Sequence, residues 1–362
     1  MRTLFNLRSF ALLGLIALVC GCGGNATDTT PGTSSESTID EEAIESKLVD
    51  AGGSVKKDGN GSIILVDMAD KPLDENLMQQ IGELPMLQKL LLRGSTVSDA
   101  AFAKLGSPKD LQVLDARETL LTGAVLEQIG KCTKLRNLQF RGNSITDDDL
   151  QQLSGLEQLT VLGLDETQVD GHSLDSLSGL SKLEEIYLFG TPFLEANLPK
   201  LASFSTLKKI RLRGTQINGE GFAELAGLTA IEDLDVSETQ FNDTAVALLS
   251  PYKNLQRLNL WATKISDAAV PKVAELTSLT WLNLDRNSIG DAPLSELTKL
   301  NQLTWLHLGS TLVTNEGIMQ LAPMKQLKTL IVTRTEVDDA GAAQLAKEMP
   351  ATQIEHIYKP QD

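Results

Sequence analysis

The chain has 362 residues, of which 41% are hydrophobic and only 4% aromatic, and its formal net charge at pH 7 is −16. This acidic excess argues against nucleic acid as a partner and against direct adhesion of the folded chain to an anionic bilayer surface. Three cysteines are too few for a disulfide framework, so the fold has to be stabilised by its apolar core.

Residues 1–21 have the composition of a secretory signal peptide, with two arginines before an apolar run at 10–19 that is too short to span a bilayer. The run ends in V-C-G-C at residues 19–22, which resembles the lipobox of bacterial lipoproteins. The resemblance implies cleavage after Gly21 and lipidation of Cys22. An ordinary secreted protein and an uncleaved anchor are the alternatives.

Residues 22–39 are small, polar and free of aromatic side chains, which predicts a flexible tether. Together with the lipidated cysteine, this predicts an exported protein of the cell envelope. A lipid anchor would hold it to a membrane, with the folded part facing the periplasm or the cell surface.

Residues 40–62 predict an N-terminal cap made of a helix and a hairpin. In the helix, expected at 40–51, Asp40 is the candidate cap, and the inner stripe is expected to be Ile44, Leu48 and Val49. A short strand at 54–57 and the glycine-rich turn at 58–61 then predict a hairpin with the next strand.

From residue 63 to residue 350 an apolar residue recurs every 24 positions without an insertion, which indicates a stack of twelve similar units. Counting Ile63 as position 1, all twelve units are apolar at positions 1, 4, 6, 11 and 19. Positions 4 and 6 alternate with polar neighbours, as in a strand with one buried face. Positions 16, 19 and 22 follow at helical spacing. Each unit is therefore predicted to be a short strand, a turn and a helix of about two to three turns.

Polar residues recur at three further positions. Position 12 is Ser, Thr, Asp or Asn in ten units, which predicts helix caps, and Asp often follows at position 13, where the helix dipole favours negative charge. Position 9 is Thr in eight units. We expect these hydroxyls to form a buried ladder that satisfies loop amides.

Residues 255–265 read L-x-x-L-x-L-x-x-T-x-I, which resembles the leucine-rich repeat signature L-x-x-L-x-L-x-x-N/C-x-L. Thr at position 9 departs from that pattern, which Asn143 and Asn287 keep. The resemblance implies an α/β solenoid, or horseshoe, of about twelve 24-residue strand-helix units with a parallel concave sheet and terminal caps. It also implies partner binding on the concave face.

At the C-terminal end, Met349 and Pro350 are expected to stop the last helix. Residues 351–362 predict a capping strand and tail, with Ile354, Ile357 and Tyr358 as its apolar residues.

Positions 3, 5 and 7 of each unit are expected to face the concave side. All three tryptophans occupy them in a chain poor in aromatic residues, and exposed aromatic residues that gather on one surface mark interaction sites. The alternative is that they shield the sheet or stack on polar side chains such as Arg257. The candidate partner-binding residues of this group are Trp261, Trp281, Trp305, His307, Tyr187 and Phe189.

Arg93, Arg117 and Arg141 occupy position 7 of three successive units and are a second candidate surface, suited to a carboxylate-bearing partner. The favoured interpretation is that neighbouring acids, among them Asp115 and Glu118, neutralise them.

Catalytic and metal-binding patterns are weak. Asp285, His307 and Ser310 could be drawn as a triad, but an open sheet face offers no evident oxyanion hole. The histidines are scattered over distant units, so no metal or cofactor is expected. The sequence thus predicts a membrane-tethered, non-catalytic protein-binding module. A glycan-binding envelope lipoprotein that uses the tryptophans, and a purely structural envelope component, are the alternatives.

Overall fold

The computed structural model of the chain describes residues 39–357. The predicted export signal, nearly all of the tether, the lipidation site at Cys22 and the terminal Tyr358 lie outside the described residues. Within residues 39–357, no helix is both long enough and apolar enough to cross a membrane.

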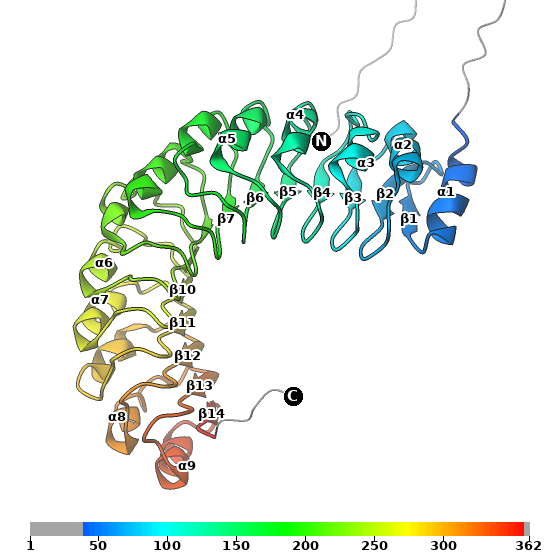
Figure 1. Ribbon diagram of the computed structural model, residues 1–362. Helices are drawn as coiled ribbons and strands as arrows, with labels where there is room; N and C mark the ends of the chain where they lie inside the picture. The colour runs from blue at the N-terminus through cyan, green and yellow to red at the C-terminus, as the bar shows by residue number, and fades with distance from the viewer. Residues whose placement is uncertain (1–38, 358–362) are drawn as a thin grey trace, which may run out of the picture. The chain divides into compact units, whose positions relative to one another are not determined.

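A single sheet of fourteen strands follows the order of the chain (Figure 1). β1 (Ser54–Lys57) pairs antiparallel with β2 (Ile63–Asp67) in the predicted hairpin, and every later pair is parallel. The twelve strands that follow β2 have three residues each: β3 (Lys89–Leu91), β4 (Val113–Asp115), β5 (Asn137–Gln139), β6 (Val161–Gly163), β7 (Glu185–Tyr187), β8 (Lys209–Arg211), β9 (Asp233–Asp235), β10 (Arg257–Asn259), β11 (Trp281–Asn283), β12 (Trp305–His307), β13 (Thr329–Ile331) and β14 (Gln353–Glu355).

Helical segments return the chain from one strand to the next on the opposite side of the stack (Figure 1). The α-helices are α1 (Glu41–Asp50), α2 (Glu75–Glu83), α3 (Asp99–Ala103), α4 (Leu126–Ile129), α5 (Asp147–Leu150), α6 (Asp243–Ala247), α7 (Val270–Val273), α8 (Asn315–Met319) and α9 (Asp339–Glu348). The 3-10 segments are η1 (Gly123–Val125), η2 (Gln151–Leu153), η3 (Leu174–Leu177), η4 (Glu195–Ser203), η5 (Glu220–Ala223), η6 (Asp267–Ala269) and η7 (Leu294–Lys299).

The prediction of a two- to three-turn α-helix in every unit is wrong for most of them. Among the twelve units, only α2 and α9 approach that length, and units three to seven, nine and ten use 3-10 turns alone or combined with a short α-helical turn. The apolar positions 16, 19 and 22 are three residues apart, which matches the three residues per turn of a 3-10 helix better than the 3.6 of an α-helix. Leu150, Leu153 and Leu156 show the result, since all three are fully buried.

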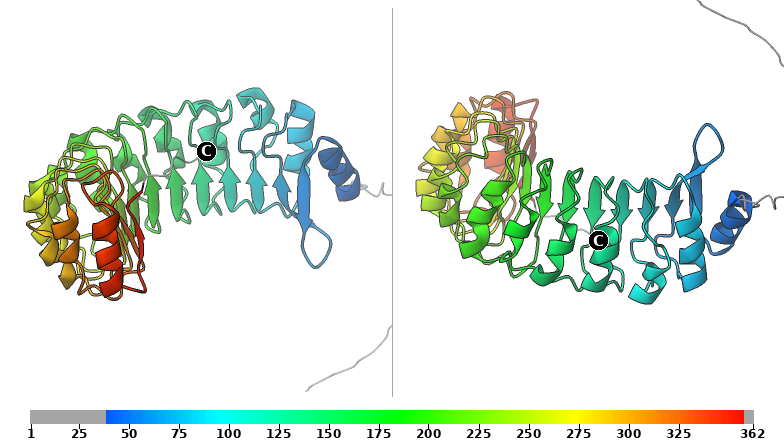
Figure 2. Two further views of the ribbon diagram at one scale, coloured as in Figure 1. Left: turned by 90° about the horizontal axis from the view of Figure 1, so that it is seen from below. Right: turned by 90° about the horizontal axis from the view of Figure 1, so that it is seen from above.

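Residues 39–357 curve so that the sheet lines the inner side and the helical segments lie outside (Figure 1). Strand spacing is about 4.8 Å and packed helices need about 8–10 Å, so the stack bends toward its strands. In the views of Figure 2 the strands run side by side across the inner face, and the β1–β2 hairpin projects past its neighbours.

The core is one continuous cluster between sheet and helical segments. All sixty residues at positions 1, 4, 6, 11 and 19 are buried, as predicted. Position 4 lies in the middle of each strand, and residues such as Leu258 and Leu282 pair there in register. A Leu→Ala change at such a site is expected to cost about 2–5 kcal/mol.

The strand of every unit ends in the same left-handed residue at position 8. It is glycine in four units, and φ is positive at the other eight as well, for example +55° at Glu118 and +52° at Ala262. This turn lets the Thr at position 9 donate its hydroxyl to the carbonyl at position 6, as Thr239 does to Val236 at 2.6 Å.

The threonines at position 9 are buried as expected, apart from the partly buried Thr335, but they mainly satisfy carbonyl groups rather than the predicted amides. Asn143 differs because its side-chain amide donates to the carbonyls of both Ala116 and Phe140, at 2.7 and 3.0 Å, and so joins two units.

Side chains at position 13, six acids and Asn315, join consecutive units, a role that the sequence did not indicate. In seven units the side-chain oxygen at this position accepts a hydrogen bond from a backbone N–H at the start of the next unit's helical segment, as Asp243 does from Ser266 at 2.7 Å. The predicted caps at position 12 are also present, for example Ser98 accepting from the N–H of Ala101. Position 13 therefore ties one unit to the next.

Both ends of the stack have the expected caps, with corrections. In α1, Asp40 accepts from the N–H of Ala43 at 3.0 Å and Leu48 is buried, but Val49 is 53% exposed and does not belong to the inner stripe. At the other end β14 stops at Glu355, and Ile357 is 59% exposed rather than part of the strand.

Candidate functional site

Five aromatic side chains gather on the concave face between β7 and β12, and we call them the concave aromatic cluster: Tyr187, Phe189, Trp261, Trp281 and Trp305. They occupy the outward positions 3, 5 and 7, so none is part of the core between sheet and helices. Each is half-buried rather than exposed as predicted. Neighbouring side chains account for the difference.

Trp281 and Trp305 stack face to face with ring centroids 4.4 Å apart and planes 6° apart. They are register partners on β11 and β12, so the ring separation is close to the strand spacing. The ring normals thus run along the stack, and the ring edges point into the concavity. His307 meets Trp305 edge-on at 5.7 Å.

Cationic side chains cover most of these rings. Arg257 lies 4.5 Å from the ring centre of Trp281, on the side opposite to Trp305 by strand order. Arg213 lies between two rings, 4.9 Å from Phe189 and 4.8 Å from Trp261. Cation–π contacts of this kind contribute about 0.5–1 kcal/mol each at exposed sites. They hold the aromatic side chains in fixed orientations.

Three further cation–π contacts complete the cluster. Arg211 and Lys209 flank Tyr187 at 5.1 and 5.5 Å, and Arg286 lies 5.6 Å from Trp261. The alternative interpretation, that the tryptophans stack on polar neighbours such as Arg257, therefore holds for Trp261 and Trp281, whereas the ring contacts of Trp305 among the described residues are with Trp281 and His307. These contacts leave the ring edges available to a partner.

A hollow of about 370 Å³ opens within the cluster, over β8 to β11. Asp233 lies in it between Lys209 and Arg257, with N–O distances of 3.3 and 3.6 Å. The residues that line the hollow are Lys209, Ile210, Arg211, Asp233, Asp235, Arg257, Asn259 and Trp281. Apart from Trp281, sequence reasoning did not place them in a site. Apart from the buried Ile210 at position 4, they occupy positions 3 and 5, as Tyr187, Trp281 and Trp305 do, and these positions were the available signal.

Arg93 and Arg117 lie away from this cluster and are paired with acids. Arg93 is 3.8 Å from Asp70, and Arg117 donates two hydrogen bonds to Asp115, at 2.8 and 2.6 Å. Asp115 and Glu118 both approach arginines of this row as expected, Glu118 at 3.9 Å from Arg141, and Asp70 is a further partner that the sequence did not indicate.

Arg141 connects the arginine row to the aromatic cluster. It donates to both oxygens of Glu166 at 3.1 Å, is 3.9 Å from Glu118, and lies 6.0 Å from the ring of Phe189. The arginines are thus held by acids, and their guanidinium groups are not free to receive a carboxylate without exchanging partners.

Asp165 is a buried carboxylate beneath the cluster. It accepts a hydrogen bond from the N–H of Phe189 at 2.7 Å, and Arg211 approaches it at 3.5 Å. Burial raises the pKa of this carboxyl, and the N–H of Phe189 and the charge of Arg211 oppose the shift.

His307 does not form the hydrogen bonds of a catalytic triad. Among the described residues, no hydrogen bond joins it to Asp285 or Ser310, and Ser310 is in the left-handed turn with φ +51°. Burial lowers the pKa of His307, against the opposing charges of Asp285 and Glu355. The geometry supports a side chain that packs on Trp305, not a general base.

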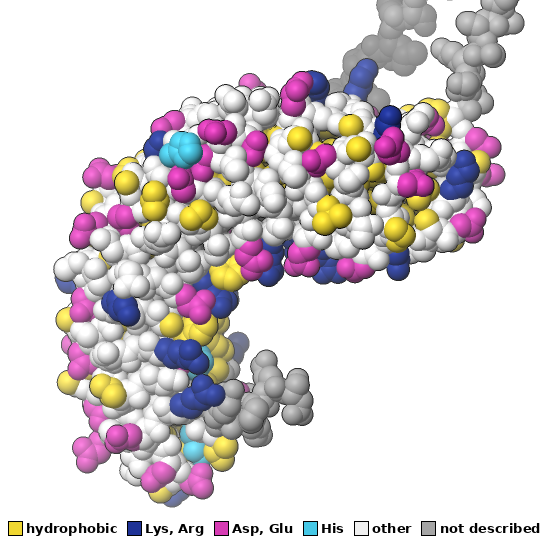
Figure 3. All heavy atoms as spheres, in the orientation of Figure 1, with side chains coloured by type: hydrophobic (Ala, Val, Ile, Leu, Met, Phe, Trp, Pro, Cys, Tyr) yellow, Lys and Arg dark blue, Asp and Glu magenta, His cyan; other side chains and the backbone are white. Residues whose placement is uncertain are grey.

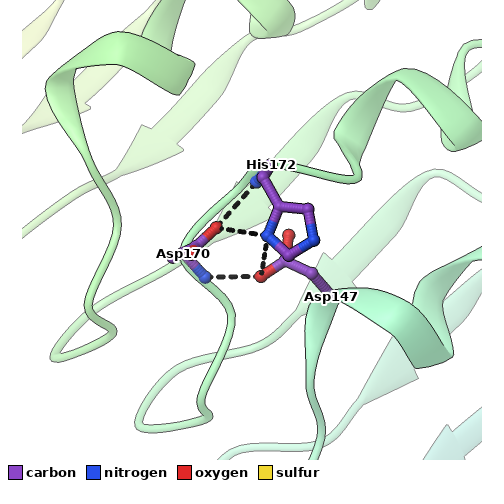
Figure 4. Close-up of side chains that lie close together, drawn as sticks. All are labelled: Asp147, Asp170 and His172. Carbon is purple, nitrogen blue, oxygen red and sulfur yellow. Dashed lines mark hydrogen bonds and ion pairs between the residues drawn. The ribbon is translucent and has the colours of Figure 1, made fainter.

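Asp147, Asp170 and His172 form a group of candidate metal ligands in the described residues, with ligand atoms within 4.8 Å of one another (Figure 4). His172 Nδ1 is 2.8 Å from Asp170 Oδ1 and 3.7 Å from Asp147 Oδ2. The carboxylate of Asp147 already accepts from the N–H groups of Asp170, Gly171 and Ser173, at 2.6, 3.1 and 3.0 Å. This is the position-13 contact between units, so the group has a structural explanation.

Charged side chains of both signs line the inner edge of the arc in Figure 3, and hydrophobic surface joins them where the arc bends. The inner face is thus mixed in charge, although the chain carries a net charge of −16. The concave aromatic cluster and its hollow are the strongest candidate site on the described residues.

Comparison with known proteins agrees with the fold. Residues 133–193 match the leucine rich repeat family. An internalin (inlF) of Listeria monocytogenes is 19% identical with a TM-score of 0.62, over 88% of this chain and 94% of that chain. A leucine-rich repeat protein of Leptospira interrogans is 18% identical with a TM-score of 0.52, over 76% of this chain and 80% of that chain.

The functional domain of InlJ from Listeria monocytogenes is 15% identical with a TM-score of 0.57, over 82% of this chain and 63% of that chain. Among curated proteins, none matches the sequence. At these identities the likeness concerns the fold alone.

Proposed function

We propose that this chain, which is a leucine-rich repeat protein, binds a protein partner on its concave face and has no catalytic role. The concave aromatic cluster around its hollow is the observation that carries this function. Aromatic and arginine side chains are the residue types that most often dominate binding energy at protein interfaces. Here they are half-buried and fixed by mutual contacts, which lowers the entropy lost on binding.

The arrangement of the rings favours protein over glycan. A sugar stacks on the face of an aromatic ring, but Trp281 has Trp305 on one face and Arg257 on the other, and among the described tryptophans Trp305 alone has no cation against its ring. Both faces of Trp261 and Phe189 are also approached by cations from two units. Ring edges together with paired charges match the mixed surface of a protein better than a saccharide ring.

We further propose that the protein acts in the cell envelope, tethered through a lipid at Cys22 and the polar segment 22–39. Several acyl chains on one cysteine would hold a protein stably, where a single chain is marginal. Mass spectrometry of the mature N-terminus tests this proposal. An acylated Cys22 is expected, and an unmodified residue there would rule out the lipid anchor.

Photo-cross-linking from the two sides of the solenoid tests the binding function. A photoreactive amino acid replaces Thr329 on β13, beside the cluster, or Gln344 on α9, which is exposed on the outer side. The variants are irradiated in the native cell, and the adducts are identified by mass spectrometry.

A defined protein adduct is expected from position 329 and not from position 344. Adducts made only of glycan would favour the glycan-binding alternative. Adducts made only of a second copy of this chain would favour a structural component. Equal adducts from both positions would contradict binding on the concave face.

A further inference from the structure

We infer, on the basis of the proposed function, that the partner inserts a single acidic side chain into the hollow of the concave aromatic cluster. Lys209, Arg211 and Arg257 bind its carboxylate there. These three cations differ from other arginines of the concave face in their hydrogen bonds, and they outnumber the acids that line the hollow.

The cations of the hollow lie near acids without donating hydrogen bonds to them. Lys209 and Arg257 approach the same carboxylate, that of Asp233, at 3.3 and 3.6 Å, and Arg211 approaches Asp165 at 3.5 Å. These are ion-pair distances without hydrogen-bond geometry. Within residues 39–357, the three side chains donate no hydrogen bond to another residue.

Other arginines of the concave face are held more closely. Arg213 donates from Nε to Glu238 at 2.7 Å, and Arg141 donates to both oxygens of Glu166 at 3.1 Å. A guanidinium group has five N–H donors and an ammonium group has three, and a carboxylate is an acceptor whose shape and charge match them. The donors around the hollow are therefore available to an acid of the partner, whereas those of Arg213 and Arg141 are partly occupied.

Aromatic rings hold the three cations in place. The ring centre of Trp281 lies 4.5 Å from Arg257, and that of Tyr187 lies 5.1 Å from Arg211 and 5.5 Å from Lys209. A ring attracts the positive charge through its face, but it does not replace an oxygen acceptor. Side chains fixed in this way lose less entropy when they bind a carboxylate. The hollow of about 370 Å³ that they line has room for one acidic side chain.

The charge of the hollow is positive although that of the chain is negative. The ionisable residues that line it are three cations and two acids: Lys209, Arg211, Arg257, Asp233 and Asp235. The net charge of −16 is spread over the whole chain and is screened by salt beyond about 10 Å. A carboxylate inside the hollow therefore meets an excess of positive charge at short range.

A second hollow beside the first limits the partner to one acid. It measures about 250 Å³ and shares Asp233 and the two cations next to it with the first hollow. It adds three acids and one cation, namely Glu184, Glu185, Glu232 and Lys208. A second carboxylate there would meet acids in excess, and the net charge of the chain opposes a run of acids over a longer distance. We therefore expect one acidic residue in an otherwise neutral or basic segment.

Binding of two matched synthetic peptides to the full chain tests the inference. Both are acetylated and amidated and read glycine, phenylalanine, X, phenylalanine, glycine, where X is glutamate in one and glutamine in the other. The phenylalanines supply apolar contacts to the cluster, so the peptides differ only in the carboxylate. Affinity is measured by nuclear magnetic resonance titration of the indole N–H signals, which suits the weak binding of short peptides.

The glutamate peptide is expected to bind about 3- to 10-fold more tightly than the glutamine peptide. Arg257→Gln should reduce this ratio to within about twofold, because it removes a group that binds the carboxylate. Arg213→Gln is the matched control and should leave the ratio unchanged, since Arg213 also stacks on aromatic rings but already donates to Glu238. Circular dichroism confirms that each variant is folded.

Asp233→Asn should act in the opposite direction. Its carboxylate competes with the partner for Lys209 and Arg257, so its removal should raise the affinity for the glutamate peptide several-fold. The affinity for the glutamine peptide should stay the same. A gain that is specific for the charged peptide is not expected from a loss of structure.

Equal binding of the two peptides, no detectable binding of either, or an equal loss of the ratio in Arg257→Gln and Arg213→Gln would overturn the inference. Unchanged affinity for the glutamate peptide in Asp233→Asn would do the same. The cross-link at position 329 distinguishes this failure from failure of the proposed function. A defined protein adduct together with equal peptide binding would leave the function standing without the acidic side chain. Absence of any adduct would remove the function itself.

Discussion

Backbone strain in this protein is concentrated at single residues, those at position 8 of each unit. The left-handed conformation costs an ordinary residue about 1–2 kcal/mol, and glycine avoids that cost. Eight units nevertheless carry side chains there. At Glu166 and Glu238 the side chain has a use, because it pairs with an arginine of the preceding unit.

Ala262 has the strained backbone without such a contact, at φ +52°. Ala262→Gly should therefore raise the free energy of unfolding by about 0.5–1 kcal/mol, since relief of strain exceeds the extra entropy of the unfolded chain. Urea denaturation followed by circular dichroism measures the change. Ala101→Gly in α3 is the control and should lower stability by about 1 kcal/mol. A loss of stability in Ala262→Gly would contradict the account of position 8.

Cys132 gives a prediction for alkaline pH. Burial raises the pKa of this thiol to about 11, whereas the same group in the unfolded chain ionises near 9. The folded state keeps the proton longer, so its contribution to stability is complete below pH 9 and is lost as pH rises toward 11. With Cys20 and Cys22 replaced by serine, stability should fall less between pH 8.5 and 10.5 in Cys132→Ala than in its parent. If the free energy of unfolding fell equally with pH in Cys132→Ala and its parent, ionisation of this thiol would not contribute to the loss of stability.

At the scale of elements, the strands were predictable and the helical segments only in part. The alternation of apolar and polar residues around positions 4 and 6 predicted the strands. The whole signal lies within three consecutive residues, so it can be recognised from the local sequence. Hydrogen bonds between units join residues 21 to 29 positions apart in the sequence, and no local sequence pattern indicates them. For this reason the acid at position 13 was predicted to interact with the dipole of its own helix. In the structure, Asp243 instead accepts a hydrogen bond from the N–H of Ser266 in the next unit.

Substitutions of Asp147 and Asp148 can distinguish the two explanations of the acid at position 13, which are the helix dipole and the hydrogen bonds to the next unit. They are adjacent in α5, and their side chains are 3% and 93% exposed. Asp147→Ala leaves three N–H groups of the next unit without their acceptor and should cost about 2–4 kcal/mol. Asp148→Ala should change stability by less than about 0.5 kcal/mol. Thermal and urea denaturation of both variants provides the comparison. Equal losses would favour the dipole over the contact between units.

On the scale of the whole molecule, the constant 24-residue register is the property on which the rest depends. It predicted the order of the strands, the buried face and the placement of the three tryptophans on one surface. It did not predict how Arg213 lies between Phe189 and Trp261. That depends on side-chain packing across several units, where rotamers rather than spacing decide the contact.

Removal of one complete unit should leave the solenoid folded, because each unit contacts mainly its neighbours. Deletion of residues 111–134 removes β4 and its helical segment and leaves the concave aromatic cluster intact. We expect a cooperative thermal transition at a somewhat lower temperature, measured by circular dichroism and calorimetry. Deletion of residues 111–122 alone, half a unit, should abolish the transition. Unfolding of both variants would show that the units are less independent than the register indicates.

Separate residues of each unit form the core and the concave face, where we propose that the partner binds. Positions 1, 4, 6, 11 and 19 face the interior, while positions 3, 5 and 7 lie on the inner surface. Substitutions at the second set can therefore accumulate with little effect on the first. A scaffold of this kind lends itself to laboratory evolution, in which a library randomised only along the concave strands could be selected for new ligands without rebuilding the protein beneath them.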